Sequence, residues 1–227
     1  NFRFILFGFY PQELQWRPLV AMLILFGLLF YSRDRRHWKK PLGYAWITGL
    51  VLMGVLMTGG IFGMTHVEST QWSGLPLTLL LAVFGLTAAY PLGVILALGR
   101  RSKMPAVKIM SILYIELIRG VPLISLLFMS SIIFPLFLPE GITINKILRA
   151  QVAIILFTAA YIAEVVRGGL QGISRGQYEA AESLGLNYVL TMRLIILPQA
   201  LKIVIPPSVS ILISAFKDTS LVVIIAL

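Results

Sequence analysis

Polar and ionisable side chains lie inside several long apolar stretches of this sequence, at spacings that would let them contact a polar solute together. Tyr161 and Glu164 are three residues apart, and Ser210 and Ser214 are four apart, so each pair shares a face if its stretch is helical. Arg119 interrupts a further stretch. Because such groups are unfavourable inside a membrane, they commonly mark a solute pathway. We therefore expect these five residues to line one.

The charged members of this set also have simpler interpretations as structural ion pairs. Glu116 and Arg119 are spaced i and i+3, so they could pair at the membrane surface. Glu164 could pair with Arg167 or with Arg119. A broken helix end beside Arg119 could instead hold a carboxylate group of a solute. The sequence alone leaves these alternatives open.

The remaining chemistry-bearing residues indicate neither a catalytic site nor a metal site. Lys217 and Asp218 are adjacent and point in different directions, so we expect them to mark the end of a span. The chain has no cysteine, and His37 and His66 lack the spacing of metal ligands. The His-Glu-x-x-His and Gly-x-Ser-x-Gly patterns of hydrolases are also absent from the sequence. We therefore expect no catalytic residue and no metal ligand.

The elements that would position these residues are long apolar helices. Of the 227 residues, 58% are hydrophobic and the mean hydropathy is +0.91. Only 12% are charged, about half of the ~25% that is usual in a soluble domain. The apolar residues form continuous runs rather than an alternating pattern, which favours helices over strands. This composition predicts an all-α membrane protein, a polytopic helical bundle.

Seven apolar runs are expected to cross the membrane. They comprise residues 18–31, 44–64, 74–99, 109–138, 150–166 and 194–216, and a seventh run that begins at Thr219. Arg119, Gly120 and Pro122 interrupt the fourth run, so we expect that span to be broken. Pro206 and Pro207 predict a kink in the sixth.

The net charge of +10 is explained by the loops between these runs. Residues 32–40, 99–108 and 167–202 are rich in lysine and arginine, and they alternate with loops that are not. Such loops lie in the cytoplasm by the positive-inside rule. The excess of positive charge therefore indicates membrane topology, and we expect no nucleic-acid partner.

The cytoplasmic segment 176–198, GQYEAAESLGLNYVLTMRLIILP, is unusually polar for this chain. Ser174 and Gln177 form a capping-box pattern, which predicts a helix from about Arg175. Gly185 is placed to end that helix in a left-handed conformation. Asn187 is placed to cap a second helix.

This second helix is expected to begin at about Tyr188, and Pro198 is expected to weaken the backbone ladder that follows it. The segment has two interpretations. An amphipathic helix could rest on lipid, although two glutamates suit that role poorly. Alternatively, the small residues Ala180 and Ala181 would let a cytoplasmic protein approach the backbone closely.

The spacing within this segment resembles the EAA loop of permease subunits of bacterial ABC importers. The residues in register are Glu179, Ala180, Ala181, Gly185, Ile195, Leu197 and Pro198. The segments SGLPLTLLLAVFGL (73–86), ELIRGVPLI (116–124), AYIAEVVRGGLQGI (160–173) and FKDTSL (216–221) resemble other blocks of the polar amino-acid branch of that family. The likeness covers residues 73–227, and the chain looks most like a general L-amino-acid permease.

The resemblance implies a type I ABC importer permease fold. It implies a core over residues 71–227, incomplete at its C-terminus, and two extra transmembrane helices within residues 1–70. The EAA segment would be the coupling helix that docks on a separate ATPase. No Gly-x-x-x-x-Gly-Lys-Ser/Thr phosphate loop occurs in the chain. ATP and Mg would therefore be bound by the partner, and this chain would need no cofactor.

The resemblance also implies an assembly in the bacterial inner membrane. A second permease subunit, identical or different, would pair with this one, two ATPase subunits would bind below, and a periplasmic binding protein would deliver L-amino acids. An ion-coupled secondary transporter and an ABC permease for another small polar solute are the alternatives. A membrane enzyme or a structural scaffold would not require the EAA spacing. Which amino acids are carried stays open.

Overall fold

The computed structural model describes residues 2–61 and 63–225, and within them every regular element is helical. The chain divides into two compact units. The first contains the residues up to Leu81 together with Asn145–Ile147, and the second contains Ala82–Ile144 and Leu148–Ile225. The boundary at residue 70 that the sequence predicts between the N-terminal region and the core stays a prediction.

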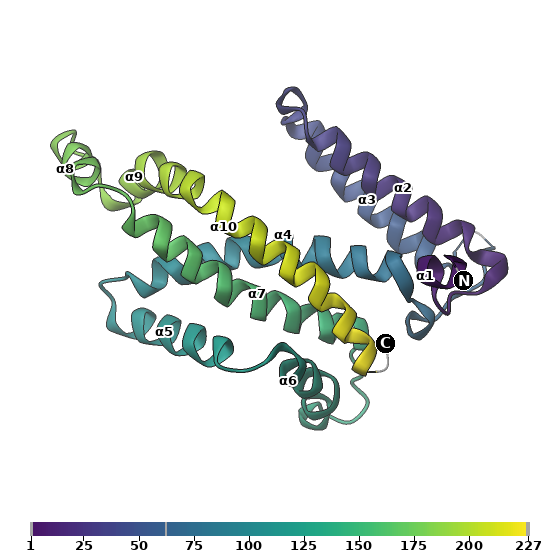
Figure 1. Ribbon diagram of the computed structural model, residues 1–227. Coiled ribbons are helices and arrows are strands. Elements are labelled where there is room, and N and C mark those ends of the chain that lie inside the picture. Colours follow the sequence, from purple (N-terminus) through teal and green to yellow (C-terminus); the bar gives the residue numbers. More distant parts are fainter. Residues whose placement is uncertain (1, 62, 226–227) are drawn as a thin grey trace. The chain divides into compact units, whose positions relative to one another are not determined.

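The first unit is built on a helical hairpin. Helices α2 (Trp16–Ser32) and α3 (Lys40–Thr58) lie side by side, joined by a turn that contains η2 (Arg35–His37) (Figure 1). The short elements α1 (Phe2–Phe7) and η1 (Gln12–Leu14) precede the hairpin, and η3 (Ser69–Gln71) follows it. Both long helices are apolar enough to cross a membrane.

Helix α3 ends six residues before the predicted end of its run at residue 64, so this part of the prediction is wrong. Gly59 and Gly60 have φ angles of 65° and 77°, a left-handed conformation that glycine adopts easily and that ends an α-helix. Apolar residues continue beyond this point. The apolar stretch of sequence therefore extends further along the chain than the helix does.

A buried arginine fastens the segment after α3 to the hairpin. The Arg17 side chain donates from Nη1 to the Thr65 carbonyl at 2.8 Å and from Nη2 to the Thr65 hydroxyl at 3.3 Å. Arg17 is only 3% exposed. The Tyr10 hydroxyl donates to the Met57 carbonyl at 3.0 Å, in the last turn of α3. These bonds satisfy carbonyl groups that the helix end and the turn leave free.

The second unit contains the remaining helices. They are the greater part of α4 (Gly74–Arg100), then α5 (Pro105–Arg119), α6 (Leu123–Phe128), η4 (Met129–Ile133), η5 (Phe134–Phe137), α7 (Lys146–Gln171), α8 (Arg175–Ser183), α9 (Tyr188–Thr191), η6 (Met192–Ile196), α10 (Leu197–Asp218) and η7 (Thr219–Ile225). Helices α8 and α9 lie at one end of this unit, and α6 lies at the other (Figure 1).

The interruption predicted in the fourth apolar run is confirmed. Helix α5 and the helical segment Leu123–Phe137 meet at an angle of 103°. Gly120 closes α5 by donating its N–H to the Glu116 carbonyl at 2.9 Å, and Pro122 stands directly before α6. A proline favours extended backbone in the residue that precedes it, which separates the two helices.

Small residues let α4, α7 and α10 pack closely. A methyl group placed on Gly93 of α4 would lie 2.7 Å from Ile162 Cγ2 on α7. One placed on Gly169 of α7 would lie 3.0 Å from the Ala200 carbonyl oxygen and would collide with Val204 on α10. The first distance is shorter than real Cβ contacts, and the collision with Val204 excludes a side chain at Gly169 unless a neighbour moves. Close backbone approach through small residues is the usual way in which membrane helices associate.

Within residues 2–61 and 63–225, five helices are long and apolar enough to cross a membrane, and the bent pair adds a sixth span if it counts as one. They correspond to the first six predicted runs. The seventh run, from Thr219, is the 3₁₀-helix η7 as far as Ile225, and residues 226–227 lie outside the described residues. Helix α10 continues through Pro206 and Pro207.

Candidate functional site

Helix α8 is an exposed helix with a well-formed C-terminal cap. It begins at Arg175 and ends at Ser183, and Gly185 follows with a φ of 70°. The Gly185 N–H donates to the Glu182 carbonyl at 2.8 Å, and the Leu186 N–H donates to the Ala181 carbonyl at 3.1 Å. These two bonds form a Schellman motif. The predicted start and the predicted left-handed glycine are both confirmed.

The capping box predicted at the start of α8 is wrong. Ser174 precedes the helix, but its side chain makes no capping hydrogen bond. The Gln177 N–H donates instead to the Ser174 carbonyl at 3.1 Å. The Gln177 side chain is engaged elsewhere, since its Oε1 accepts a hydrogen bond of 2.8 Å from Gln199 Nε2. This contact connects α8 to the first turn of α10.

The second helix of the segment is capped as predicted. The Asn187 side chain accepts a hydrogen bond of 3.0 Å from the Leu190 N–H at the start of α9. Helix α9 widens into the π-helical turn η6 before α10 begins. The irregularity thus precedes Pro198, whereas the prediction placed it afterwards. Proline lacks an N–H and its ring displaces the carbonyl four residues earlier, which accounts for the wider turn.

The predicted coupling residues divide into an exposed set and a buried set. Ala181 is fully buried and packs α8 onto the unit, whereas Glu179, Ala180 and Gly185 are exposed. Pro198 is exposed as well, and the other two predicted residues, Ile195 and Leu197, are half-buried. The outer face of α8 therefore presents small and acidic residues to any partner.

An arginine at the end of α4 holds α8 from the other side. Arg101 Nη1 donates to the Tyr178 hydroxyl and to the Leu170 carbonyl, at 3.3 Å in each case. Its guanidinium group lies 5.8 Å from the centroid of the Tyr178 ring. Arginine over an aromatic ring is a favourable contact. One side chain thus joins α4, the last turn of α7 and α8.

The neighbouring residue, Arg100, enters a cluster of charges around Glu164. Glu164 accepts hydrogen bonds from Arg167, with 2.7 Å to Nε, and from Arg100 at 3.3 Å. Arg119 lies 3.8 Å from the same carboxylate. Glu116 pairs with Arg100 at 2.9 Å, rather than with Arg119 as one alternative proposed. Both pairings proposed for Glu164 occur together.

Three of the predicted pathway residues meet in a cleft of about 300 Å³ between α7 and α10. Tyr161, Ser210 and Ser214 line it, together with the carboxylate-bearing residue Asp218. Helix α10 ends at Asp218, as expected for the end of a span, and this residue also lies in the lining of the cleft. The sequence held a signal for that second position, because residues 210, 214 and 218 repeat every four positions.

Arg119 and Glu164, the other two predicted pathway residues, adjoin this cleft without lining it. The Arg119 guanidinium lies 5.5 Å from the centroid of the Tyr161 ring, and Glu164 holds Arg119 from the other side. Arg100 completes the group and was not predicted, because its place in a basic loop already had an explanation in topology. The cleft thus has the carboxylate of Asp218 in its lining. A charge cluster with more arginines than carboxylates lies next to Tyr161, which also lines the cleft.

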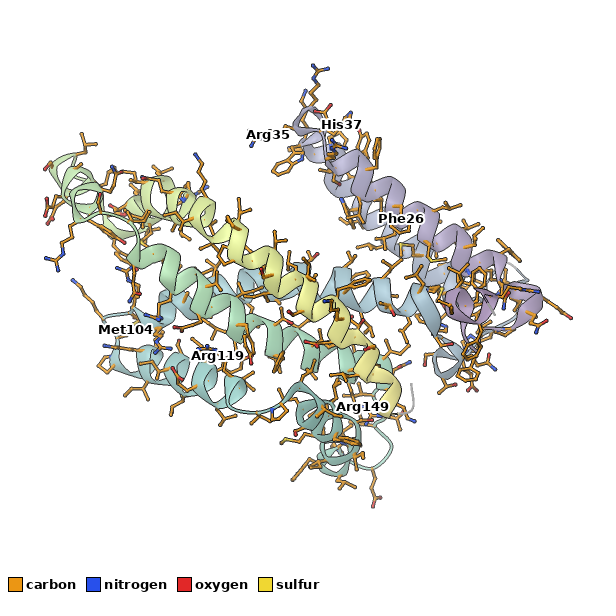
Figure 2. All side chains as sticks on the ribbon, viewed as in Figure 1. Phe26, Arg35, His37, Met104, Arg119 and Arg149 are labelled. Atoms are coloured by element: carbon orange, nitrogen blue, oxygen red, sulfur yellow. The ribbon has the colours of Figure 1, made fainter. Side chains whose placement is uncertain are left out.

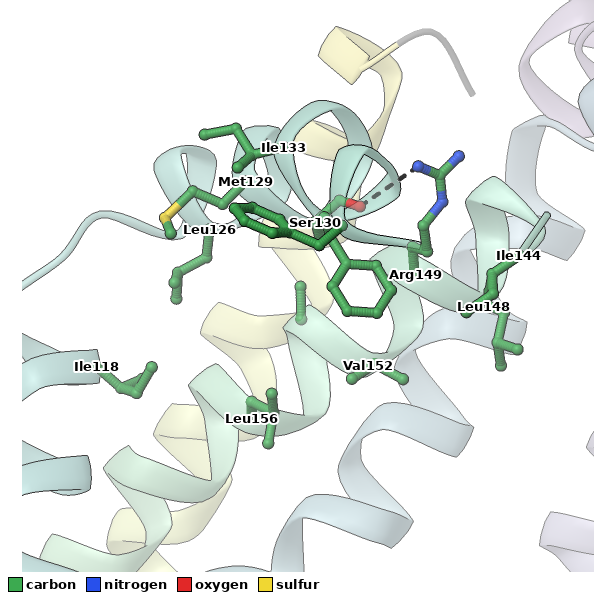
Figure 3. A pocket seen from close by; sticks show the side chains of 13 residues that line it. Ile118, Leu126, Met129, Ser130, Ile133, Ile144, Leu148, Arg149, Val152 and Leu156 are labelled. Carbon is green, nitrogen blue, oxygen red and sulfur yellow. Dashed lines mark hydrogen bonds between the residues drawn. The ribbon is translucent and has the colours of Figure 1, made fainter. Parts of the chain in front are cut away.

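A larger cavity of about 450 Å³ lies near α6 and has a different character (Figure 3). Apolar side chains such as Ile118 and Leu156 form its walls. Its one charged side chain, Arg149, donates to the carbonyl groups of Ser131 at 2.5 Å and Ser130 at 3.5 Å, which η4 leaves free. A zwitterionic solute would lose its hydration there without compensating hydrogen bonds. The cleft is therefore the better site for a polar solute.

Comparison with known proteins identifies the family. Residues 89–227 match the model of the binding-protein-dependent transport system inner membrane component family. The chain belongs to this family. The resemblance to permease subunits of bacterial ABC importers is thereby confirmed.

Individual relatives agree with this assignment. The chain is 52% identical, over 98% of its length, to the inner membrane amino-acid ABC transporter permease protein YhdY of Escherichia coli (strain K12). It is 39% identical, again over 98% of its length, to the glutamate/glutamine/aspartate/asparagine transport system permease protein BztC of Rhodobacter capsulatus. The chain spans 61% and 64% of the lengths of these two relatives.

A solved structure supports the fold class. The structure described as an amino acid ABC transporter with histidines matches with a TM-score of 0.60 and 33% sequence identity. The match covers 68% of this chain and 71% of the other. The predicted all-α bundle of the ABC permease type is thereby confirmed.

Proposed function

We propose that the chain is the membrane-spanning subunit of an ATP-driven importer that moves L-amino acids across the bacterial inner membrane. The observation that carries this proposal is the exposed, capped helix α8, which bears the EAA spacing and is hydrogen-bonded to Arg101, the chain neighbour of Arg100 in the charge cluster beside the cleft. The family and the names of the relatives support an amino acid as the solute.

In this proposal α8 is the coupling helix. Glu179 and Ala180 are exposed, so they can contact a groove on an ATPase subunit. The turn after α8 is formed at Gly185. The chain then returns toward the membrane through Ile195, Leu197 and Pro198. ATP and Mg are bound by the ATPase. The complete importer contains two ATPase subunits, a second permease subunit and a periplasmic binding protein for amino acids.

The two arginines at the end of α4 supply the physical connection between α8 and the cleft. A displacement of α8 moves Tyr178 and hence Arg101, which directly follows Arg100, the last residue of α4. Arg100 shares Glu164 with Arg119, which lies against Tyr161 in the cleft wall. Coupling between distant sites requires such a contiguous network with more than one arrangement. Ion pairs that are partly exposed can exchange partners, which suits this role.

The cleft suits a zwitterion. The Asp218 carboxylate and the hydroxyl groups of Ser210 and Ser214 can accept hydrogen bonds from an ammonium group. Arg119, at the other side of Tyr161, can attract a carboxylate when Glu164 shifts toward its other arginines. Polar groups of this kind are expected within a span only where they bind a solute or pair with one another.

The test is transport by the complete importer reconstituted in liposomes. We expect L-amino-acid uptake to require ATP and the binding protein, and to persist when ion gradients are collapsed. Asp218→Asn should raise the KM for uptake, whereas Lys217→Gln, at the adjacent position, should not. Uptake driven by an ion gradient without the ATPase would overturn the proposal in favour of secondary transport.

A further inference from the structure

A groove of about 690 Å³ lies where the end of α4 and the start of α5 meet α9 and the start of α10. Its wall is apolar, with Ile95 and Leu98 from α4, Val107 from α5 and Leu197 from α10. Ile95 is 63% exposed, so the wall is open to its surroundings. No residue of α8 and no residue of the amino-acid cleft is among its lining residues, although Leu197 also belongs to the proposed coupling segment and Arg101 contacts α8.

The rim of the groove is positively charged. Arg101, Lys103 and Arg193 are the charged residues in its lining, and no carboxylate is among them. Arg101 is held by Tyr178 and Leu170. Lys103 and Arg193, by contrast, make no ion pair or side-chain hydrogen bond with any part of the chain that the structure describes. The rim therefore has two cationic side chains that can bind an anion.

The groove lies at the boundary of the apolar region. One candidate span ends at Arg100 and another begins at Tyr188, and both positions are at this groove. Figure 2 shows Met104, which also lines the groove, at the turn that leads into α5. Ile95 is five residues from the end of α4, so the wall reaches about 7.5 Å into the span at 1.5 Å per residue.

We propose that this groove binds an anionic phospholipid of the cytoplasmic leaflet. The phosphate group contacts Lys103 and Arg193, and an acyl chain lies along Ile95 and Leu197. Basic pockets between helices on the cytoplasmic side are suited to such headgroups, and Tyr188 at the boundary is the residue type that favours the membrane interface. A soluble ATPase would account for the charged rim. It would not account for an apolar wall that continues into the span.

The experiment uses the complete importer reconstituted in vesicles of equal parts phosphatidylglycerol and phosphatidylcholine. The importer is then extracted in mild detergent, and its bound lipids are identified by native mass spectrometry. The test variant is the double substitution Lys103→Gln and Arg193→Gln. The matched control, Arg35→Gln with Lys39→Gln, removes the same two charge types from another exposed basic turn.

We expect the wild type and the control to retain phosphatidylglycerol in excess over phosphatidylcholine, and the test variant to lose that excess several-fold. The exchange variant Lys103→Arg with Arg193→Lys keeps both charges and should retain the lipid. Equal retention by the test variant and the wild type would overturn the proposal. Loss of the ATPase subunit from the test variant with the lipid retained would also overturn it, and would assign the groove to the ATPase.

Discussion

Each unit of the molecule contains an arginine-centred polar contact within its apolar helices, and the two are built differently. In the first unit, Arg17 is almost fully buried and donates to a carbonyl and a hydroxyl group of Thr65, while its Nε has no hydrogen-bond partner among the described residues. In the second, Glu164 is 20% exposed in its side chain and is shared among three arginines. The first contact joins Arg17 to a single residue, whereas the second offers one carboxylate to three arginines. We infer that Arg17 maintains the fold and that the Glu164 cluster changes during transport.

Among the substitutions that test this comparison, Glu164→Gln should have the largest effect on transport. The substitution leaves three guanidinium groups facing an uncharged amide. In a partly exposed site this costs about 2 kcal/mol, which corresponds to a roughly thirtyfold lower uptake rate. The measurement is the ATP-driven uptake rate per reconstituted importer. If uptake were unchanged while thermal stability fell, the cluster would be a fixed structural contact like that of Arg17, and the comparison would fail.

Arg17→Met should show the opposite pattern. It removes the two hydrogen bonds that the Arg17 guanidinium donates to Thr65, at a cost of about 1–3 kcal/mol in stability. We expect a lower thermal midpoint of the purified protein and a normal uptake rate per folded molecule. Arg17→Lys, which keeps a donor, should recover part of the loss. A drop in uptake without a drop in stability would contradict a purely structural role.

Tyr178→Phe should have a smaller effect, confined to coupling. It removes the hydroxyl group that accepts a hydrogen bond from Arg101 and leaves the aromatic ring in place. The lost hydrogen bond is worth about 1 kcal/mol, which corresponds to a few-fold weaker coupling. The ratio of amino acid transported to ATP hydrolysed should fall, while binding of the ATPase persists. An unchanged ratio would remove Arg101 from the route between α8 and the cleft.

Glu116→Gln should have the smallest effect. Its side chain is 56% exposed and its single partner, Arg100, keeps Glu164. Partly exposed pairs of this kind contribute about 0–1 kcal/mol. Uptake is expected within about twofold of the wild type. An effect as large as that of Glu164→Gln would show that the cluster acts as one unit, with Glu116 as an equal member.

The sequence predicted features that depend on neighbouring residues. The left-handed Gly185, the Asn187 cap and the break at Gly120 and Pro122 are all local, and the structure has each of them. The bundle of long helices also followed from hydropathy, because length and apolar content determine whether a helix can span. The overlong prediction for α3 has the same origin, since hydropathy does not detect a helix end formed by glycine.

The contacts that join distant segments could not be predicted in this way. Arg101 and Tyr178 are 77 residues apart, and Arg100 and Glu164 are 64 apart. Each arginine had a sufficient explanation as a topogenic charge, so nothing in the sequence required a partner. The capping box failed for a related reason, because Gln199 competes for the Gln177 side chain only once α10 lies beside α8.

The most direct test of the central claim, that α8 is the coupling helix, is ATP-dependent uptake by the reconstituted importer carrying Glu179→Lys or Gly185→Asp, with ATPase co-purification measured in parallel. Glu140→Lys, the same charge reversal in an exposed loop, serves as the control. We predict that both α8 variants reach the membrane but lose the ATPase and uptake, while the control keeps both. Normal assembly and uptake in both variants would contradict the claim and would make α8 a helix that only rests on lipid.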